Sequence, residues 1–309
     1  MQTSHQPVML EAVIKNLNIV SGGTYVDCTF GRGGHSKNIL KEIGKNGKLI
    51  AIDRDIEAAK YAQKNFLSDK RFIFEKNNFS NILSIIERHI GKKKVNGIVL
   101  DLGVSSPQLD DPNRGFSFMK DGPIDMRMDT SNNLTAKKWL EEAGAEEISR
   151  VLKTYGEERY AKRIANSIKN AISDNNLHTT TDLSQIIIEC YPKNKKYKKN
   201  PATRSFQAIR IFINKELQEL EKILEDCLKI IAIGGRLVII SFHSLEDRIV
   251  KNFINEHSIG KNIISKLPIT NIKKNLSLKK IKVPLTASEK EINKNIRSRS
   301  AKIRVAERI

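Results

Sequence analysis

The 309-residue sequence is poor in cysteine, in tryptophan and in long apolar runs. Its three cysteines, Cys28, Cys190 and Cys227, stand singly, which excludes a disulfide scaffold and a zinc ribbon built from paired cysteines. No window of the sequence reaches the roughly 18 apolar residues that a membrane span needs. The first residues lack a basic and an apolar segment, so we expect no secretion signal, no membrane contact and a cytoplasmic protein.

Acidic residues are scarce relative to basic ones. Lys and Arg number 54 against 35 Asp and Glu, which gives a net charge of +19, and residues 261–309 carry 14 basic and three acidic side chains. A second basic stretch interleaves lysines and tyrosines: Lys193, Lys195, Lys196, Lys198 and Lys199 with Tyr191 and Tyr197. Clustered positive charge favours a polyanionic partner, although lysine-rich surfaces also occur without one.

Apolar runs alternate with helical patterns over residues 8–125, which predicts βαβ units and a parallel sheet of the α/β class. The expected strands are 24–28, 48–52, 71–75, 97–102, 235–242 and 300–307. The expected helices are 36–43, 56–66 (with Asp55 as its N-cap), 82–89, 136–143, 145–154, 158–170, 181–190, 202–230 and 245–255. Residues 106–133 lack periodicity and predict a long loop. A helical block, 111–211, thus interrupts a discontinuous α/β domain formed by 1–110 and 212–309.

The sharpest local motif covers residues 27–36, a glycine-rich stretch between an expected strand and an expected helix. Glycines let the backbone turn tightly and approach a ligand closely. Asp53 ends the next strand, where its carboxylate can accept hydrogen bonds from both hydroxyls of a ribose. A dinucleotide or S-adenosylmethionine would suit this arrangement, and a turn without ligand stays open. Ser36 breaks the dinucleotide pattern, and Asp101 at the end of the fourth strand favours a cationic ligand over a pyrophosphate.

Several further motifs stand in order along the chain. Together with the glycine loop they are residues 5–8, 27–36, 101–108, 114–118, 121–129, 155–158, 201–208, 241–248 and 297–302. With these motifs the chain closely resembles the RsmH (MraW) family of bacterial small-subunit ribosomal RNA cytosine-N4 methyltransferases over nearly its whole length. It departs from the family pattern at Asn200, where histidine is usual, and at Ile296, where proline is usual.

The resemblance implies a class I, Rossmann-like S-adenosylmethionine-dependent methyltransferase domain with an inserted all-helical domain that recognises the substrate. It implies methyl transfer to the exocyclic N4 of a specific cytidine in the decoding region of 16S ribosomal RNA. The partner would be that RNA within an assembled or nearly assembled small subunit, and a homodimer is left open. Carried over motif by motif, the donor contacts fall on Gly33, Gly34, His35, Asp53, Phe79, Asp101 and Gln108.

The catalytic residues are not fixed by the sequence. The candidates for holding the reacting amine or taking its proton are Asp101, Ser105, Ser106 and His243. A loop-shaping role for the two serines, and an orienting role for His243, are equally open. We interpret His35 as a donor-binding residue rather than a general base.

No metal is expected, since the methyl donor supplies the driving force and no ligand-spaced pairs occur among the His and Cys residues. Asp121, Asp125 and Asp129 are interpreted as members of a folded loop that pairs internally with Arg127. We expect Trp139 to pack in the helical block. Two phenylalanines of the 105–118 loop, Phe116 and Phe118, would either stack against RNA bases or pack within the loop.

Three other functions stay open at this point. A dinucleotide oxidoreductase is disfavoured by Ser36 and Asp101. A basic RNA-binding module without donor chemistry is disfavoured because Gly33, Asp53 and Asp101 are all present. A methyltransferase acting on DNA or another RNA would share the donor site, and only the family resemblance separates it.

Overall fold

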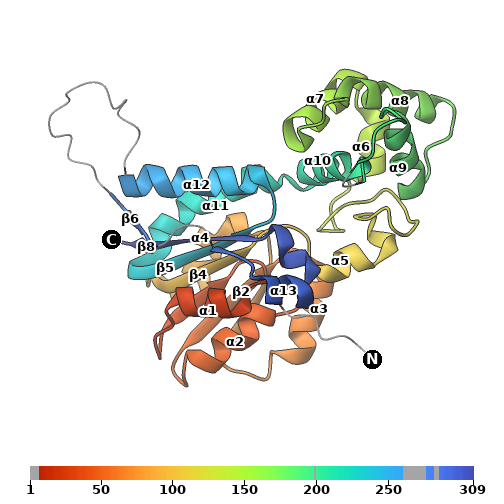
Figure 1. Ribbon diagram of the computed structural model, residues 1–309. Coiled ribbons are helices and arrows are strands. Elements are labelled where there is room, and N and C mark those ends of the chain that lie inside the picture. The colour runs from red at the N-terminus through yellow and green to blue at the C-terminus, as the bar shows by residue number, and fades with distance from the viewer. Residues whose placement is uncertain (1–6, 198–199, 260–275, 282–284) are drawn as a thin grey trace, which may run out of the picture. The chain divides into compact units, whose positions relative to one another are not determined.

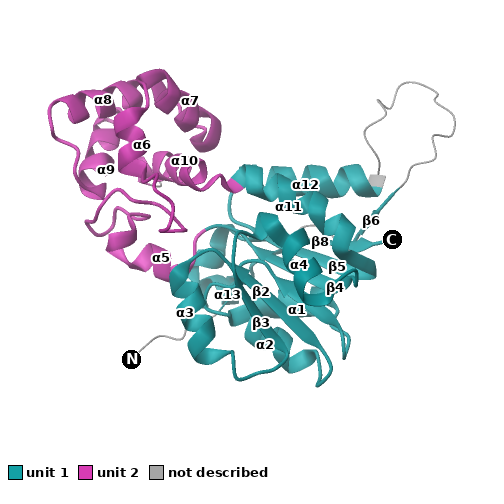
Figure 2. Ribbon diagram, turned by 180° about the vertical axis from the view of Figure 1, so that it is seen from behind, with its two compact units in different colours: residues 1–103, 217–309 teal, residues 104–216 magenta. Residues whose placement is uncertain are grey.

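A computed structural model describes residues 7–197, 200–259, 276–281 and 285–309. Four residues of the sequence motifs, His5, Gln6, Lys198 and Lys199, therefore lie outside the described residues. The chain divides into two compact units, 1–103 with 217–309 and 104–216 (Figure 2). Within the described ranges, no helix is both long and apolar enough to cross a membrane.

The first unit is built on one sheet with the strand order β3-β2-β1-β4-β5-β8-β6, and β7 also pairs with β8 (Figure 1). Strands β1 to β5 run parallel, whereas β8 is antiparallel to β5. The strands are β1 (Thr24–Asp27), β2 (Lys48–Asp53), β3 (Phe72–Lys76), β4 (Val95–Asp101), β5 (Ile231–Ser241), β6 (Leu278–Lys280), β7 (Leu285–Thr286) and β8 (Lys302–Arg308). The predicted α/β class with a mostly parallel sheet is confirmed.

Helices cover both faces of this sheet because its strands bury side chains on both sides. Along β2, Leu49 and Ala51 belong to one core, and Ile50 and Ile52 belong to the other. The first core includes residues of α1 (Leu10–Leu17), α2 (Gly34–Glu42) and α3 (Ile56–Asn65). The second includes residues of α4 (Ile82–Ile90), α11 (Glu216–Ile230) and α12 (Ser244–Ile259). The expected N-cap is confirmed, since the Asp55 carboxylate accepts from the N–H of Glu57 at 2.9 Å.

The second unit is helical. Its helices are α5 (Ser106–Asp110), α6 (Ala136–Glu142), α7 (Ala145–Gly156), α8 (Ala161–Ser173), α9 (Thr180–Glu189) and α10 (Ala202–Asn214). They enclose one apolar core, in which Trp139 is 4% exposed, so the packing expected for this residue is confirmed.

Two expectations about this region are wrong. The helix expected over 202–230 is broken, because Lys215 adopts a left-handed backbone with φ +52° between α10 and α11. Residues 106–133 are not loop throughout, since α5 and a short 3₁₀ turn, Pro112–Arg114, lie within them. Pro107 in the first turn of α5 suits a helix start.

The limits of the helical unit also differ from the expected 111–211. Val104 and Leu109 at its start, and Phe212 and Ile213 at its end, pack against its core. The second compact unit runs from residue 104 to residue 216.

Candidate functional site

Three aspartates end three neighbouring parallel strands of the first unit. Asp27 is the last residue of β1, Asp53 the last of β2 and Asp101 the last of β4, and the strand order places β1 between the other two. Ligands of open α/β sheets bind at the carboxyl ends of the strands. The edge formed by these three residues is therefore where a ligand is expected.

The glycine loop follows β1 and leads into α2. Gly33 precedes the helix in a left-handed conformation, with φ +67°, which L-amino acids other than glycine rarely adopt. A Cβ atom on Gly33 would lie 2.4 Å from the ring of Phe66 and 2.7 Å from that of Phe30. A Cβ atom on Gly34 would lie 2.9 Å from Pro7. Glycine is thus required here by close packing of the loop as well as by its backbone.

The buried carboxylate of Asp27 stabilises this loop through hydrogen bonds. Its carboxylate accepts hydrogen bonds from the Ser36 hydroxyl at 2.7 Å and from the N–H of Thr29 at 3.2 Å, and the residue is 1% exposed. Burial raises the pKa of Asp27, and the charge of His35 and the bond from Ser36 oppose this only in part. Ser36, which breaks the dinucleotide pattern, therefore has a structural use that sequence reasoning missed.

His35 and Asp101 leave buried polar atoms unsatisfied. Nε2 of His35 lies 3.5 Å from Oδ2 of Asp101, and His35 is 4% exposed. Among the residues that the structure describes, both ring nitrogens of His35 and Oδ1 of Asp101 have no hydrogen-bond partner. A buried polar atom without a partner costs about 1–3 kcal/mol, so these three atoms point to a ligand.

The neighbouring carboxylates change the pKa of His35. Burial alone would lower the pKa of the imidazole, but the contact with Asp101 and the negative charges of Asp101 and Asp27 outweigh it. The pKa of His35 is therefore raised above its ordinary value. A protonated imidazole here would donate from both ring nitrogens.

Asp53 is held by backbone groups. Its Oδ2 accepts from the N–H of Gly31 at 2.7 Å, and its Oδ1 accepts from the N–H of Asp55 at 2.9 Å. Each carboxylate oxygen keeps a further lone pair, so the group can still accept two hydroxyls. Burial raises the pKa of Asp53 to about 6, although both backbone bonds lower it. The carboxylate is thus oriented but costly to keep charged, as expected where a ligand completes the site.

Phe79 lies at the same edge of the sheet. It begins a 3₁₀ turn, Phe79–Asn81, just after β3, and its half-buried ring packs against the core on one face. Within the first unit, the structure thus places Gly33, Gly34, His35, Asp53, Phe79 and Asp101 after the carboxyl ends of neighbouring strands.

The other three predicted residues of the 101–108 motif belong to the helical unit. The N–H of Ser105 donates to Oε1 of Gln108 at 2.9 Å, and the two residues form a capping box at the start of α5. Gln108 is 5% exposed, whereas Ser106 begins the helix. The loop-shaping role left open for the serines therefore applies to Ser105.

His243 follows β5, the strand next to β4. Its Nε2 lies 3.1 Å from Oε1 of Glu246, whose Oε2 accepts from the N–H of Phe242 at 2.8 Å. Glu246 is 2% exposed and joins the end of the strand to the first turn of α12. Nε2 of His243 makes no hydrogen bond among the described residues, and the two roles considered for this residue, contact with the substrate and orientation of the loop, stay predictions.

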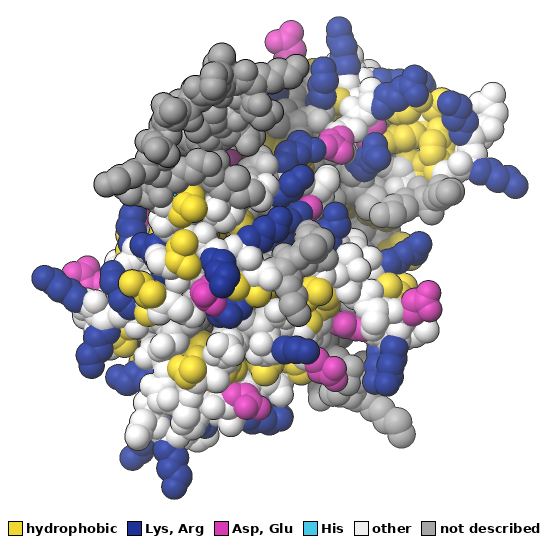
Figure 3. All heavy atoms as spheres, turned by 60° about the vertical axis from the view of Figure 1, so that its left-hand side comes forward, with side chains coloured by type: hydrophobic (Ala, Val, Ile, Leu, Met, Phe, Trp, Pro, Cys, Tyr) yellow, Lys and Arg dark blue, Asp and Glu magenta, His cyan; other side chains and the backbone are white. Residues whose placement is uncertain are grey.

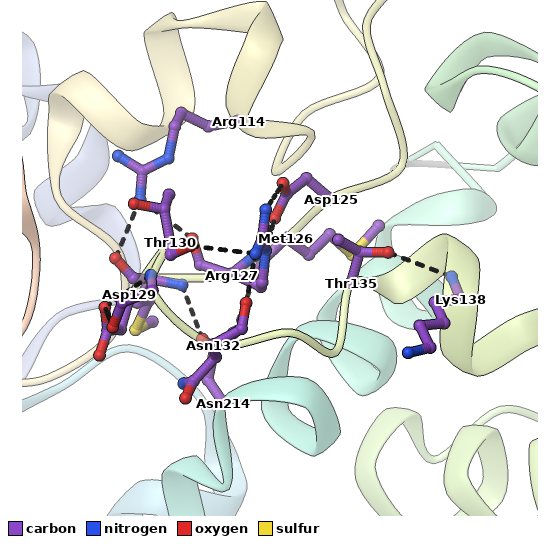
Figure 4. Close-up of polar contacts among 12 residues, drawn as sticks. Arg114, Asp125, Met126, Arg127, Asp129, Thr130, Asn132, Thr135, Lys138 and Asn214 are labelled. Atoms are coloured by element: carbon purple, nitrogen blue, oxygen red, sulfur yellow. Dashed lines mark hydrogen bonds and ion pairs between the residues drawn. The ribbon is translucent and has the colours of Figure 1, made fainter.

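Figure 4 shows the folded loop that carries the motif 121–129. Arg127 pairs with Asp125 through two contacts, of 2.7 Å and 2.6 Å, which confirms the expected ion pair. Asn214 of α10 closes the loop, since its side chain accepts from the N–H of Met128 and donates to the carbonyl of Met126. The Asp129 carboxylate accepts hydrogen bonds from the N–H and from the hydroxyl of Ser131.

The two phenylalanines of the preceding segment pack in the same unit. Phe116 is 7% exposed within the helical core, and Phe118 meets the ring of Phe206 edge-on at 4.8 Å. Packing, the second of the two roles considered for these residues, therefore accounts for Phe116.

Comparisons with known proteins give a consistent result. The model of the MraW methylase family matches residues 2–309. A protein of Hydrogenovibrio crunogenus named ribosomal RNA small subunit methyltransferase H is 49% identical over 308 residues, covering 100% of this chain and 98% of its own length. A protein of the same name from Coxiella burnetii is 48% identical over 306 residues, covering 99% of each chain.

Among solved structures, a protein from Clostridium thermocellum is similar with a TM-score of 0.45 and 10% identity, covering 99% of this chain and 98% of its own length. The family match and the two relatives span almost the whole sequence at nearly half identity. The chain belongs to the MraW methylase family.

Proposed function

We propose that this protein transfers a methyl group from S-adenosylmethionine to the exocyclic N4 of a specific cytidine in the decoding region of small-subunit ribosomal RNA. The observation that carries the donor half is the set of three unsatisfied buried atoms, both ring nitrogens of His35 and Oδ1 of Asp101, beside the glycine loop. The names of the curated relatives support small-subunit ribosomal RNA as the substrate. The choice of cytidine N4 rests on the motifs that resemble the family.

The residues at the sheet edge fit the donor. Asp53 accepts the ribose hydroxyls through its remaining lone pairs, and the loop at Gly33 and Gly34 lets the ligand approach the backbone. His35 and Asp101 pair with polar groups of the methionine portion. When bound, S-adenosylmethionine supplies a methyl group on a positively charged sulfur, which suits the excess of carboxylates here. Phe79 completes the set of contacts that this unit offers, and the contact expected of Gln108 stays a prediction.

The acceptor amine is a poor nucleophile because its lone pair is delocalised into the cytosine ring. A catalyst must align it with the methyl group at roughly 3 Å and accept its hydrogens. Of the four candidates, Ser105 caps a helix and His243 faces Glu246. Among the described residues, Oδ1 of Asp101 and Nε2 of His243 both lack a hydrogen-bond partner, so these two residues are the first to test as acceptors of an amine hydrogen.

The RNA must present the base outside a helix, because N4 takes part in Watson–Crick pairing. Figure 3 shows Lys and Arg side chains spread over the face in view, with fewer Asp and Glu side chains among them. This charge suits a phosphate backbone. The proposed substrate is the assembled or nearly assembled small subunit, in which the decoding region has its folded shape.

Mass mapping of ribosomal RNA from cells with and without the protein tests the position. We expect one cytidine of the decoding region to lose a single methyl group when the protein is missing. An unchanged RNA would contradict the proposal.

A methyl-transfer assay tests the form of the substrate. Purified small subunits should react much faster than free ribosomal RNA or a short oligonucleotide. Equal rates on all three would favour a general single-strand cytosine methyltransferase instead.

A further inference from the structure

Three tyrosines of the helical unit form a continuous aromatic series. Tyr160 precedes α8, Tyr191 follows α9, and Tyr197 lies in the basic stretch. The rings of Tyr160 and Tyr191 meet edge-on with centroids 4.8 Å apart, and those of Tyr191 and Tyr197 do so at 5.3 Å. We name this series the tyrosine ladder. Sequence reasoning had paired two of its members with the lysines but could not place Tyr160 beside them.

The inner part of the ladder, Tyr160 and Tyr191, is fixed by hydrogen bonds to Glu158. The Tyr191 hydroxyl donates to Oε2 of Glu158 at 2.5 Å, and the other oxygen of Glu158 accepts from the N–H of Tyr160 at 3.0 Å. Glu158 is 3% exposed. Burial and the bond to Glu158 raise the pKa of Tyr191 well above its ordinary value, so this hydroxyl remains a donor. These contacts fix the start of the basic stretch against α8.

The outer end of the ladder faces solvent. Tyr197 is 39% exposed, and its hydroxyl donates to the carbonyl of Pro192 at 3.2 Å. The ring of Tyr191 packs against the ring of Tyr197, and the hydrogen bond of the Tyr197 hydroxyl to Pro192 fixes the other end of this side chain. An aromatic ring that is fixed before binding loses little side-chain entropy when a ligand stacks on it.

The surroundings of this ring are basic. Lys193, Lys195 and Lys196 are exposed on the same short segment. Arg159 lies over the ring of Tyr160, 5.8 Å from its centroid, and Arg204 donates to the backbone carbonyl of Glu157. Two exposed acids, Glu157 and Glu189, also lie on the neighbouring helix ends, and the latter accepts from Gln185. The basic side chains around Tyr197 outnumber these two acids.

We propose that the Tyr197 ring stacks against an unpaired base of the ribosomal RNA while Lys193, Lys195 and Lys196 contact the flanking phosphates. Proteins that hold single-stranded nucleic acid combine aromatic side chains with a basic surface in this way. The proposal rests on RNA being the substrate, and it adds a binding surface that lies wholly within the helical unit. The alternative is that the ladder only tethers the segment.

The test uses the full-length protein and a fluorescently labelled single-stranded oligoribonucleotide of mixed sequence. Tyr197→Ala should weaken RNA binding about 5- to 150-fold, the range for losing one base–aromatic stack. Tyr197→Phe keeps the ring and should bind within about twofold of the parent. The control is Leu134→Ala, which removes an apolar side chain of the same unit that is 38% exposed, and which should leave the RNA affinity unchanged.

Two further measurements separate stacking from tethering. An abasic oligomer of the same length should bind the parent and Tyr197→Ala equally, because no base is present to stack. The slope of affinity against salt should be the same for both proteins, since the lysines remain.

The proposal is overturned if Tyr197→Ala binds the mixed oligomer as the parent does, or if Tyr197→Phe fails as Tyr197→Ala does. The proposed function has its own test, methyl transfer by the parent protein on small subunits, which is measured without any Tyr197 variant.

Discussion

The carboxyl edge of the sheet and the tyrosine ladder meet their ligands by opposite means. At the sheet edge, Asp53 is oriented by two backbone N–H groups, and His35 and Asp101 hold buried polar atoms. At the ladder, buried contacts only anchor a segment whose charged side chains stand in water. Buried hydrogen bonds give specificity that salt scarcely weakens, whereas exposed charges give affinity that salt removes. The two proposed ligands should therefore respond differently to the same changes of solvent.

The largest effect should come from crowding the glycine loop. Gly33→Ala places a methyl group against Phe66 and Phe30 in a left-handed backbone, so the free energy of unfolding should fall by about 2–5 kcal/mol. Gly22→Ala is the matched control. Gly22 has φ +79°, but nothing lies within 4 Å of its Cβ position. Gly22→Ala should therefore lower the free energy of unfolding only through its strained backbone, by about 1–2 kcal/mol. Urea unfolding of both variants measures the difference, and equal losses would refute the packing argument.

The second largest effect should come from removing the carboxylate of Asp53. Asp53→Ala should weaken binding of S-adenosylmethionine by about 1.5–3 kcal/mol, the range for hydrogen bonds to a charged group. Calorimetric titration gives the affinity directly, and NADH should not bind. A folded variant with unchanged affinity would remove Asp53 from the donor site.

The donor affinity should also depend on pH through Asp53. Its pKa is about 6 in the folded protein and 3.8 ordinarily, so the folded state binds an extra proton between these values. The contribution of Asp53 to the free energy of unfolding therefore falls as pH rises through this window and is constant above it.

Because ribose hydroxyls donate to the ionised form, donor affinity should decrease below pH 6 by up to about tenfold per pH unit. Asp53→Asn should lack this dependence and keep any change at higher pH that comes from His35, whose pKa is raised. A parent profile that is flat between pH 5 and 7 would contradict the assignment.

The smallest effect expected at low salt is on the RNA side. Changing Lys193, Lys195 and Lys196 together to Gln should weaken RNA binding and reduce its salt slope by about 0.7 for each phosphate that a lysine no longer neutralises. Donor binding should not change. Three exposed lysines of the first unit serve as controls: Lys41, Lys45 and Lys64. If the salt slope stays the same in the first variant, those lysines only keep the surface soluble.

The sheet and its helices could be predicted because burial on both faces leaves a plain pattern of apolar runs. The aspartates that end the strands could be predicted for the same reason, since a polar residue after an apolar run marks the strand end. The break at Lys215 could not, because no glycine or proline marks this residue, which nevertheless has a left-handed backbone. The brace between Asp27 and Ser36 was missed because it joins two residues across a folded turn.

The strand order also has a consequence for synthesis of the chain. Val99 of β4 pairs with Val238 of β5, yet the whole helical unit is translated between them. At about 5–20 residues per second, β4 emerges on the order of ten seconds before its partner. During that interval β4 presents an open edge, the kind of surface through which nascent chains associate wrongly. The helical unit draws its core from residues 104–216 and can fold in the meantime, so the α/β unit is completed last.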